Sequence, residues 1–140
     1  MLAILVIFAL LASASSFLSP RPSSLRPSPA PLPASKSLST PLSPPDLPTV
    51  LSLPACLLFF SAPWCGPCRL TVPAVDAVQP LLPCFEVNVD EAEEIVDKFG
   101  VEEIPTVLVL RGGRERGRVV GTCTEAVLRR EIGRVLEGKG

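Results

Sequence analysis

Two cysteines separated by a glycine and a proline form the part of the sequence best suited to chemistry. Cys65 and Cys68 lie in the stretch Trp64-Cys65-Gly66-Pro67-Cys68. A pair at this spacing can close into a disulfide or open to a dithiol without a large movement of the backbone. The stretch therefore predicts a redox couple.

The elements around the pair predict which cysteine reacts first. The apolar run Cys56–Phe60 is typical of a buried strand, and the residues from Cys65 to about Val78 have the pattern of a helix. Cys65 would then lie at a helix N-terminus, where unpaired N–H groups and the helix dipole favour a thiolate. Arg69 adds a positive charge directly after Cys68. We expect Cys65 to be the nucleophile.

A longer series of residues resembles the thioredoxin family in order and spacing. After the five residues above, the series continues with Pro73, Val87–Asp90, Phe99–Val101, Ile104–Thr106, Gly112–Gly113 and Gly121. The resemblance runs from about Leu57 to the C-terminus. It implies an α/β domain with the thioredoxin fold, in which helices flank a mixed central β-sheet.

The resemblance also implies a function, namely a thiol-disulfide oxidoreductase that reduces disulfides in partner proteins. The Cys65 thiolate would attack the partner's disulfide, and Cys68 would then attack Cys65 and release the reduced partner. A thioredoxin reductase supplied by NADPH or ferredoxin would restore the dithiol, with no cofactor and no metal bound to this chain. The Gly66-Pro67 spacer favours reduction. A secretory-pathway disulfide oxidase or isomerase and a non-catalytic binding module remain as alternatives.

The same resemblance assigns residues to the substrate-binding surface. Trp64 would form a flat apolar surface beside the sulfurs, next to Gly66 and Pro67. If the Ile104–Pro105 peptide is cis, as in the family, Pro105 would pack on the disulfide and the Ile104 backbone would pair with an extended substrate. Alternatively, Pro105 is only a proline at the start of a strand.

A carboxylate that the family usually has is missing from this sequence. The family's buried acid, thought to exchange a proton with the second cysteine, precedes the first cysteine by six residues, and Phe59 has that position here. The family's lysine on the next strand is replaced by Glu86, which is our candidate proton relay. Alternatively, Glu86 faces solvent and water moves the proton. Ser61 replaces a usual aromatic residue and predicts a more polar groove.

The composition excludes several other kinds of site. The sequence contains no histidine, which excludes Ser/His/Asp and Cys/His catalysis and zinc sites with histidine ligands. An all-cysteine zinc site usually needs a second close pair of cysteines, and none is formed by Cys56, Cys84 and Cys123, which are far apart in the sequence. We expect Cys56 to pack as a small apolar residue and regard Cys123 as a candidate for oxidation or glutathionylation. From Asp46 onward, the sequence contains 14 acidic and 10 basic side chains. This excess of negative charge does not favour nucleic-acid binding.

The first 45 residues differ in composition from the rest. Residues 1–14 contain a short apolar run ending in Ala12-Ser13-Ala14 and are predicted to be a signal peptide, with a membrane anchor as the alternative. Residues 15–45 are rich in Ser and Pro and contain no acidic side chain, so we expect a disordered transit-like or linker segment. This two-part leader favours the plastid, and secretion or an endomembrane lumen is the alternative. We expect a monomer without stable membrane insertion once the leader is removed.

Residues 46–140 are predicted to form the thioredoxin domain. Pro48 and Pro54 allow at most a short helix between them, so the family's N-terminal strand and helix should be abbreviated here. The remaining expected elements are a strand at Phe85–Val89, a helix at Glu93–Phe99 ended by Gly100, a strand at Thr106–Leu110, a hairpin turn at Gly112–Gly113, a return strand through Val119–Val120, and a last helix after a capping box that begins at Thr122.

Overall fold

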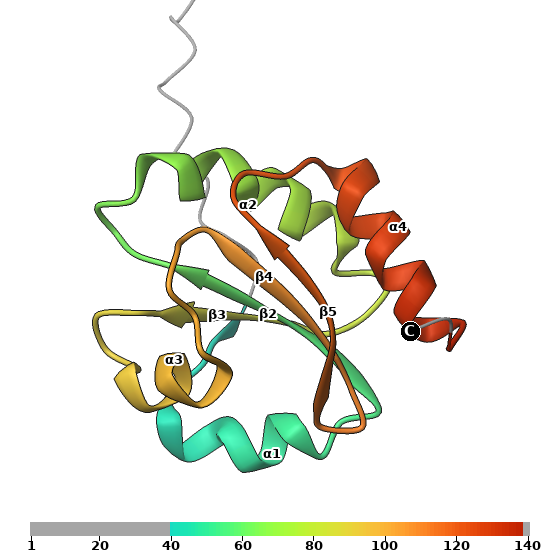
Figure 1. The fold of residues 1–140 in the computed structure, drawn as a ribbon, viewed down its shortest axis with the longest axis horizontal. Coiled ribbons are helices and arrows are strands. Elements are labelled where there is room, and N and C mark those ends of the chain that lie inside the picture. The colour runs from blue at the N-terminus through green and yellow to red at the C-terminus, as the bar shows by residue number, and fades with distance from the viewer. Residues whose placement is uncertain (1–39, 139–140) are drawn as a thin grey trace, which may run out of the picture. The chain divides into compact units, whose positions relative to one another are not determined.

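The computed structural model of the protein describes residues 40–138 (Figure 1). The predicted signal peptide, and the transit-like segment as far as residue 39, lie outside the described residues. The elements follow in the order β1 (Thr40–Pro41), the 3₁₀ turn η1 (Pro44–Asp46), α1 (Leu47–Leu51), β2 (Ala55–Ser61), α2 (Gly66–Val78), β3 (Cys84–Asn88), α3 (Glu93–Phe99), β4 (Thr106–Arg111), β5 (Arg114–Val120) and α4 (Glu125–Leu136). Between residues 40 and 138, no helix has both the length and the apolar character needed to cross a bilayer.

The five strands form one mixed sheet between two layers of helices. The strand order is β1-β3-β2-β4-β5; β1, β3 and β2 run parallel, whereas β4 pairs antiparallel with both β2 and β5. Helices α2 and α4 cover one face of the sheet, and α1 and α3 cover the other (Figure 1). This arrangement confirms the predicted α/β fold with a mixed central sheet.

Strand β2 lies at the centre of the sheet, and this explains its unbroken apolar sequence. Successive side chains of a strand point to opposite faces. Leu57 and Phe59 therefore pack under α2 and α4, whereas Leu58 and Phe60 pack against α1 and α3, and all four are fully buried. Burial of each such side chain contributes about 1.5–3 kcal/mol. The strand is thereby held firmly where it leads into the loop with the two cysteines.

Helix α2 begins immediately after Cys65 and buries one face on the sheet. Cys65 lies at the helix N-terminus, as predicted, where it is the N-cap residue, and the helix continues past Pro73 to Val78. Proline inside a helix removes one backbone hydrogen bond, yet α2 has buried residues both before and after Pro73. The buried face includes Cys68 and Val75, so α2 holds the second cysteine against the core.

The described chain has structure before Asp46, where the domain was predicted to begin. Thr40–Pro41 pairs with Phe85–Glu86, and the Leu42 N–H donates to the carbonyl oxygen of Glu86 at 2.8 Å. The Leu42 side chain is only 6% exposed. Residues 40–45 therefore differ from the disorder expected for them, because the segment pairs with β3 and buries Leu42. The N-terminal edge is nevertheless abbreviated, as predicted, since β1 has two residues and α1 has five.

The hairpin between β4 and β5 turns at two glycines, as predicted. Gly112 and Gly113 have φ values of 58° and 72°, in the left-handed region that favours glycine. A Cβ at Gly113 would lie 2.7 Å from the carbonyl oxygen of Leu51, so the turn also depends on close contact with the end of α1.

Candidate active site

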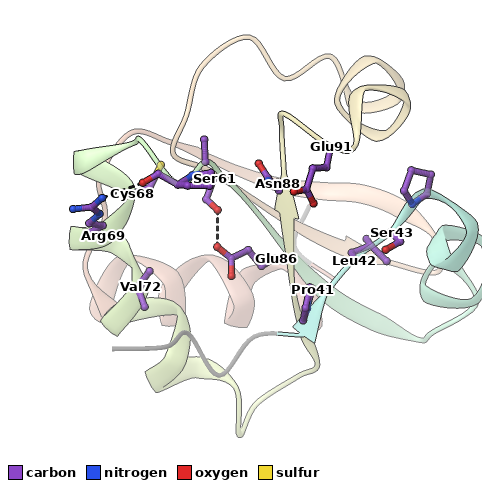
Figure 2. Close-up of a pocket in the computed structure, with 13 residues that line it drawn as sticks. Pro41, Leu42, Ser43, Ser61, Cys68, Arg69, Val72, Glu86, Asn88 and Glu91 are labelled. Carbon is purple, nitrogen blue, oxygen red and sulfur yellow. Dashed lines mark hydrogen bonds between the residues drawn. The ribbon is translucent and has the colours of Figure 1, made fainter. Parts of the chain in front are cut away.

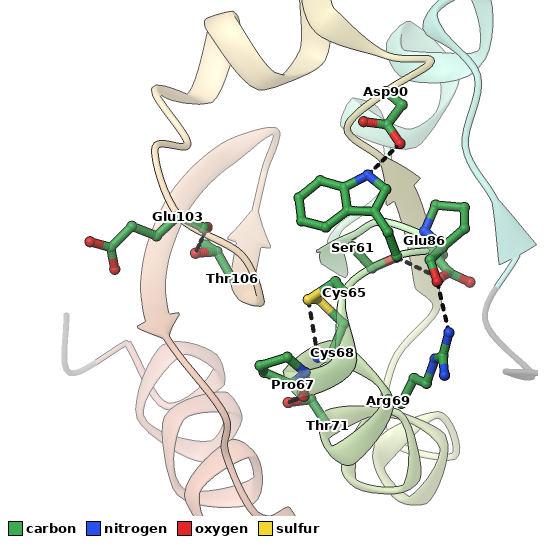
Figure 3. The surroundings of a disulfide bond; sticks show 12 residues. Ser61, Cys65, Pro67, Cys68, Arg69, Thr71, Glu86, Asp90, Glu103 and Thr106 are labelled. Atoms are coloured by element: carbon green, nitrogen blue, oxygen red, sulfur yellow. Dashed lines mark hydrogen bonds between the residues drawn. A yellow bond between two sulfur atoms is a disulfide. The ribbon is translucent and has the colours of Figure 1, made fainter.

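The two predicted redox cysteines are joined as a disulfide at the N-terminus of α2 (Figure 3). Their Cα atoms are 5.3 Å apart, and the Cys68 N–H donates to Cys65 Sγ at 3.2 Å. Arg69 donates from its guanidinium to the Pro63 carbonyl oxygen at 3.0 Å, which holds its charge beside the loop. A helix N-terminus, a donated N–H and a nearby cation all favour a thiolate on Cys65 once the disulfide is opened.

The residues around Cys65 leave an open surface. Trp64 is 66% exposed, whereas Cys65 and Cys68 are 4% and 2% exposed. Gly66 and Pro67 are exposed as well, and a Cβ at Gly66 would meet nothing within 4 Å. The two buried sulfurs therefore lie beside a surface formed by exposed residues.

The Trp64 ring is held by an acidic residue that the sequence analysis missed. Its indole Nε1 donates to Asp90 Oδ2 at 2.9 Å (Figure 3). Asp90 follows β3, the parallel neighbour of β2, and the carboxyl ends of parallel strands meet at one edge of a sheet. That topology was the signal by which Asp90 could have been found, and it fixes the orientation of an otherwise exposed ring.

The Ile104–Pro105 peptide is cis, which confirms the expectation from the resemblance. Ile104 is half-buried and packs against the apolar cluster that contains both Cys65 and Cys68. The loop before β4 lies beside the disulfide in Figure 3, where the Thr106 hydroxyl donates to the Glu103 carbonyl oxygen at 2.7 Å. Within residues 40–138, the backbone of Ile104 makes no backbone hydrogen bond.

A cavity of about 390 Å³ opens on the other side of the disulfide, where Cys68 forms part of its wall (Figure 2). Ser61 and Glu86 line the same cavity, and the Ser61 hydroxyl donates to Glu86 Oε1 at 2.6 Å. Glu86 lies opposite Phe59 in the β2–β3 register, on the face of the sheet covered by α2. The structure therefore places the candidate relay residue beside Phe59, partly buried and hydrogen-bonded, near the second cysteine.

The other three cysteines are free thiols, of which Cys56 and Cys84 are buried and Cys123 is half-buried. Burial raises the pKa of Cys56 to about 11. The pKa of Cys84 rises to about 12, through burial and then through the nearby Asp76 and Cys56. Burial also raises the pKa of Cys123, which disfavours the thiolate needed for the oxidation suggested above. Among residues 40–138, no three metal-ligating side chains come together.

These two raised pKa values predict a loss of stability at alkaline pH in the oxidised protein. Unfolded cysteines release protons near their ordinary pKa of 9.0, whereas folded Cys56 and Cys84 hold theirs up to about 11 and about 12. Between these pH values the unfolded state binds fewer protons than the folded state does. The free energy of unfolding therefore falls as pH rises from about 9. Urea unfolding at stepped pH measures the fall, which should be smaller in Cys56→Ala/Cys84→Ala than in a Cys123→Ala control. An equal fall in both variants would contradict the assignment.

Known proteins resemble the chain in both sequence and fold. The family model for thioredoxin matches residues 49–134. "Thioredoxin M-type, chloroplastic" of Chlamydomonas reinhardtii is 36% identical over 76 residues, which are 51% of this chain and 54% of that protein. Its counterpart in Zea mays is also 36% identical over 76 residues, 51% of this chain and 46% of that protein. The chain thus spans about half the length of these two relatives.

A bacterial relative and a solved structure agree with these matches. "Thioredoxin 1" of Nostoc sp. is 36% identical over 76 residues, 51% of this chain and 71% of that protein. The crystal structure of thioredoxin from Trypanosoma brucei brucei is 25% identical, covers 74% of this chain and 96% of its own, and superimposes with a TM-score of 0.64. The family model matches most of the described part, and the fold and the Cys65–Cys68 disulfide agree with it, so the chain belongs to the thioredoxin family.

Proposed function

We propose that the protein is a thiol-disulfide oxidoreductase that reduces disulfides in partner proteins. The observation that carries this proposal is the Cys65–Cys68 disulfide at the N-terminus of α2, with the Ile104–Pro105 loop beside it. Cys65 attacks one sulfur of the partner's disulfide, and the other partner sulfur leaves as a thiolate. Cys68 then attacks Cys65 Sγ, which releases the partner as a dithiol and closes the Cys65–Cys68 disulfide.

The partner binds over the exposed surface beside the disulfide. Trp64, Gly66 and Pro67 form one side of this surface, and Ile104 with Pro105 forms the other. Support comes from the exposure of the first three residues and from the open backbone of Ile104, which suits pairing with an extended segment. The cleaved partner must fit between these two sides, so the site favours a disulfide in an exposed loop.

A separate protein returns the electrons that each cycle consumes. Two electrons pass from the Cys65/Cys68 dithiol to the partner, so a thioredoxin reductase, linked to NADPH or ferredoxin, must reopen the disulfide. No cofactor or metal is needed on this chain.

We further propose that the protein acts in a plastid. The chloroplastic relatives and the Ser/Pro-rich composition before residue 40 support this location.

The reduction potential of the Cys65/Cys68 couple is the measurement that tests the proposed direction of transfer. A reductase should lie near the value of about −270 mV known for thioredoxin, whereas oxidases and isomerases lie between about −180 and −120 mV. Equilibration with glutathione or dithiothreitol buffers, read by trapping free thiols, gives the value. A potential in the higher range would contradict the proposal and favour an oxidase or isomerase of a lumen.

A further inference from the structure

The buried sulfur of Cys68 has to exchange a proton in every cycle of the proposed function. Cys68 is 2% exposed and lies in an apolar cluster, where burial favours the neutral thiol over the thiolate. Only the thiolate attacks a disulfide. A group able to accept the proton at the moment of attack would therefore speed the release of the partner, and the cavity beside Cys68 is where such a group must lie.

Two side chains in this cavity are already connected by a hydrogen bond. Ser61, at the end of β2, donates from its hydroxyl to Glu86 Oε1 at 2.6 Å. Since the hydroxyl hydrogen is committed to Glu86, the lone pairs of Ser61 Oγ remain free to accept a proton from the direction of Cys68. Figure 2 shows Ser61 pointing from β2 towards Glu86, on the side of the cavity where Cys68 lies.

The other polar groups around the cavity do not offer the same connection. Arg69, from α2, carries a positive charge and cannot accept a proton, and its guanidinium donates to Pro63. Glu91, after β3, lines the cavity but forms no hydrogen bond with Ser61 within residues 40–138. Asn88 also lines the cavity, but its side-chain oxygen accepts from the Asp90 N–H at 3.2 Å. The rest of the wall, which includes the segment Pro41–Pro44, contributes no charged side chain. The cavity volume of about 390 Å³ leaves room for several water molecules, since each takes about 30 Å³ in the liquid.

The geometry points to Glu86, acting through Ser61 and cavity water, as the group that takes the proton from Cys68 while Cys68 attacks the mixed disulfide. In this step the Cys68 S–H bond breaks and its proton passes to Ser61 Oγ, directly or through water, as the Ser61 proton moves to Glu86. The Cys68 sulfur forms a bond with Cys65 Sγ, and the partner's sulfur leaves with the bonding electrons. The proton returns by the same path when a reductase reopens the disulfide. This inference rests on the proposed function.

The test separates the two steps of exchange with a small disulfide, 5,5′-dithiobis(2-nitrobenzoic acid), added in one equivalent to the reduced full chain. Attack by Cys65 releases a first thionitrobenzoate, and attack by Cys68 releases a second. Cys68→Ser marks the first release alone. We expect Glu86→Gln to leave the first phase unchanged and to slow the second about tenfold or more near neutral pH, since positioned acid–base groups contribute about 10²–10⁴-fold and water replaces part of this. The slowed phase should recover about tenfold per pH unit as hydroxide becomes the acceptor.

Matched variants distinguish an effect on proton transfer from an effect of the cavity's charge and from a loss of folding. Glu91→Gln removes one negative charge from the same cavity and should leave the second phase unchanged, whereas Glu86→Asp keeps a carboxylate and should restore part of the rate. Ser61→Ala should slow the second phase less than Glu86→Gln does, because water can fill the space. Urea unfolding confirms that each variant is folded.

Two results would overturn the role of Glu86. One is a second phase in Glu86→Gln with the wild-type rate and pH dependence. The other is equal slowing by Glu91→Gln, which would assign the effect to the charge of the cavity. A wild-type second phase with Ser61→Ala would overturn the role of Ser61. Failure of the proposed function has a different signature, because the wild-type protein would then not reduce insulin at all.

Discussion

Replacing Cys65 with serine is expected to abolish the reduction of insulin disulfides, with a loss on the order of a thousandfold or more. A serine hydroxyl is not ionised near neutral pH and cannot replace the thiolate that starts the exchange. Cys68 cannot take over, because it lies on the buried face of α2 and lines the cavity, whereas Cys65 caps the N-terminus of the helix. The insulin turbidity assay, with dithiothreitol as electron donor, measures the loss against the uncatalysed rate.

Two further cysteine variants make this result specific. Cys68→Ser keeps the attacking thiolate but lacks the residue that resolves the intermediate, so it should accumulate a stable mixed disulfide with the partner, visible on a non-reducing gel. Cys123→Ser changes a half-buried thiol outside the redox pair and should retain wild-type activity. Substantial activity in Cys65→Ser would show that our assignment of the nucleophile is wrong. Normal turnover by Cys68→Ser would argue against the two-cysteine mechanism.

The elements that carry the redox pair could be predicted because their signals are local. The apolar run predicted as a strand at Cys56–Phe60 is β2, Ala55–Ser61, which is buried on both faces. The helix predicted from Cys65 to Val78 is α2, which begins one residue later because Cys65 itself is the cap. In both cases the residues that fix the element lie within it, so a single sequence is sufficient.

The missed features depend on residues that are far apart in the chain. The pairing of Thr40–Pro41 with β3 joins segments more than forty residues apart, and nothing in a Pro/Ser-rich sequence signals it. The contact between Trp64 and Asp90 likewise spans 26 residues. These contacts arise only after the sheet has brought β1, β3 and β2 together.

The predicted capping box shows how a distant contact can shift a helix boundary. The spacing predicted a cap at Thr122, but α4 begins at Glu125 with Thr124 as its N-cap residue, and this cap makes no side-chain hydrogen bond. The Gly121 N–H donates instead to the Pro105 carbonyl oxygen at 2.8 Å. The turn before α4 is therefore held by the loop next to the active site, and the local capping signal is overridden.

The largest effect on stability is expected from placing an acid where Phe59 lies. Phe59 is fully buried, and its removal in Phe59→Ala should cost about 3–5 kcal/mol. Phe59→Asp should cost more near neutral pH, because it adds a buried carboxylate directly opposite Glu86. Burial and this like charge both raise the pKa of the new carboxyl above its ordinary value of about 3.9. The excess cost should therefore be smallest near pH 4 or below, where the carboxyl is protonated, and should grow as pH rises.

Urea unfolding of both variants at stepped pH measures this excess as the difference in their free energies of unfolding. Leu70→Asp provides the control, since Leu70 is 73% exposed and an acid there should cost less than about 1 kcal/mol at any pH. Adding Glu86→Gln to Phe59→Asp removes the like charge and should recover part of the excess, whereas Glu91→Gln should recover less. If Phe59→Asp and Phe59→Ala were equally stable at neutral pH, water from the cavity beside Cys68 would have to reach the Phe59 position. The carboxylate would then be tolerated on either strand, and the absence of an acid at Phe59 would not require Glu86 to replace it.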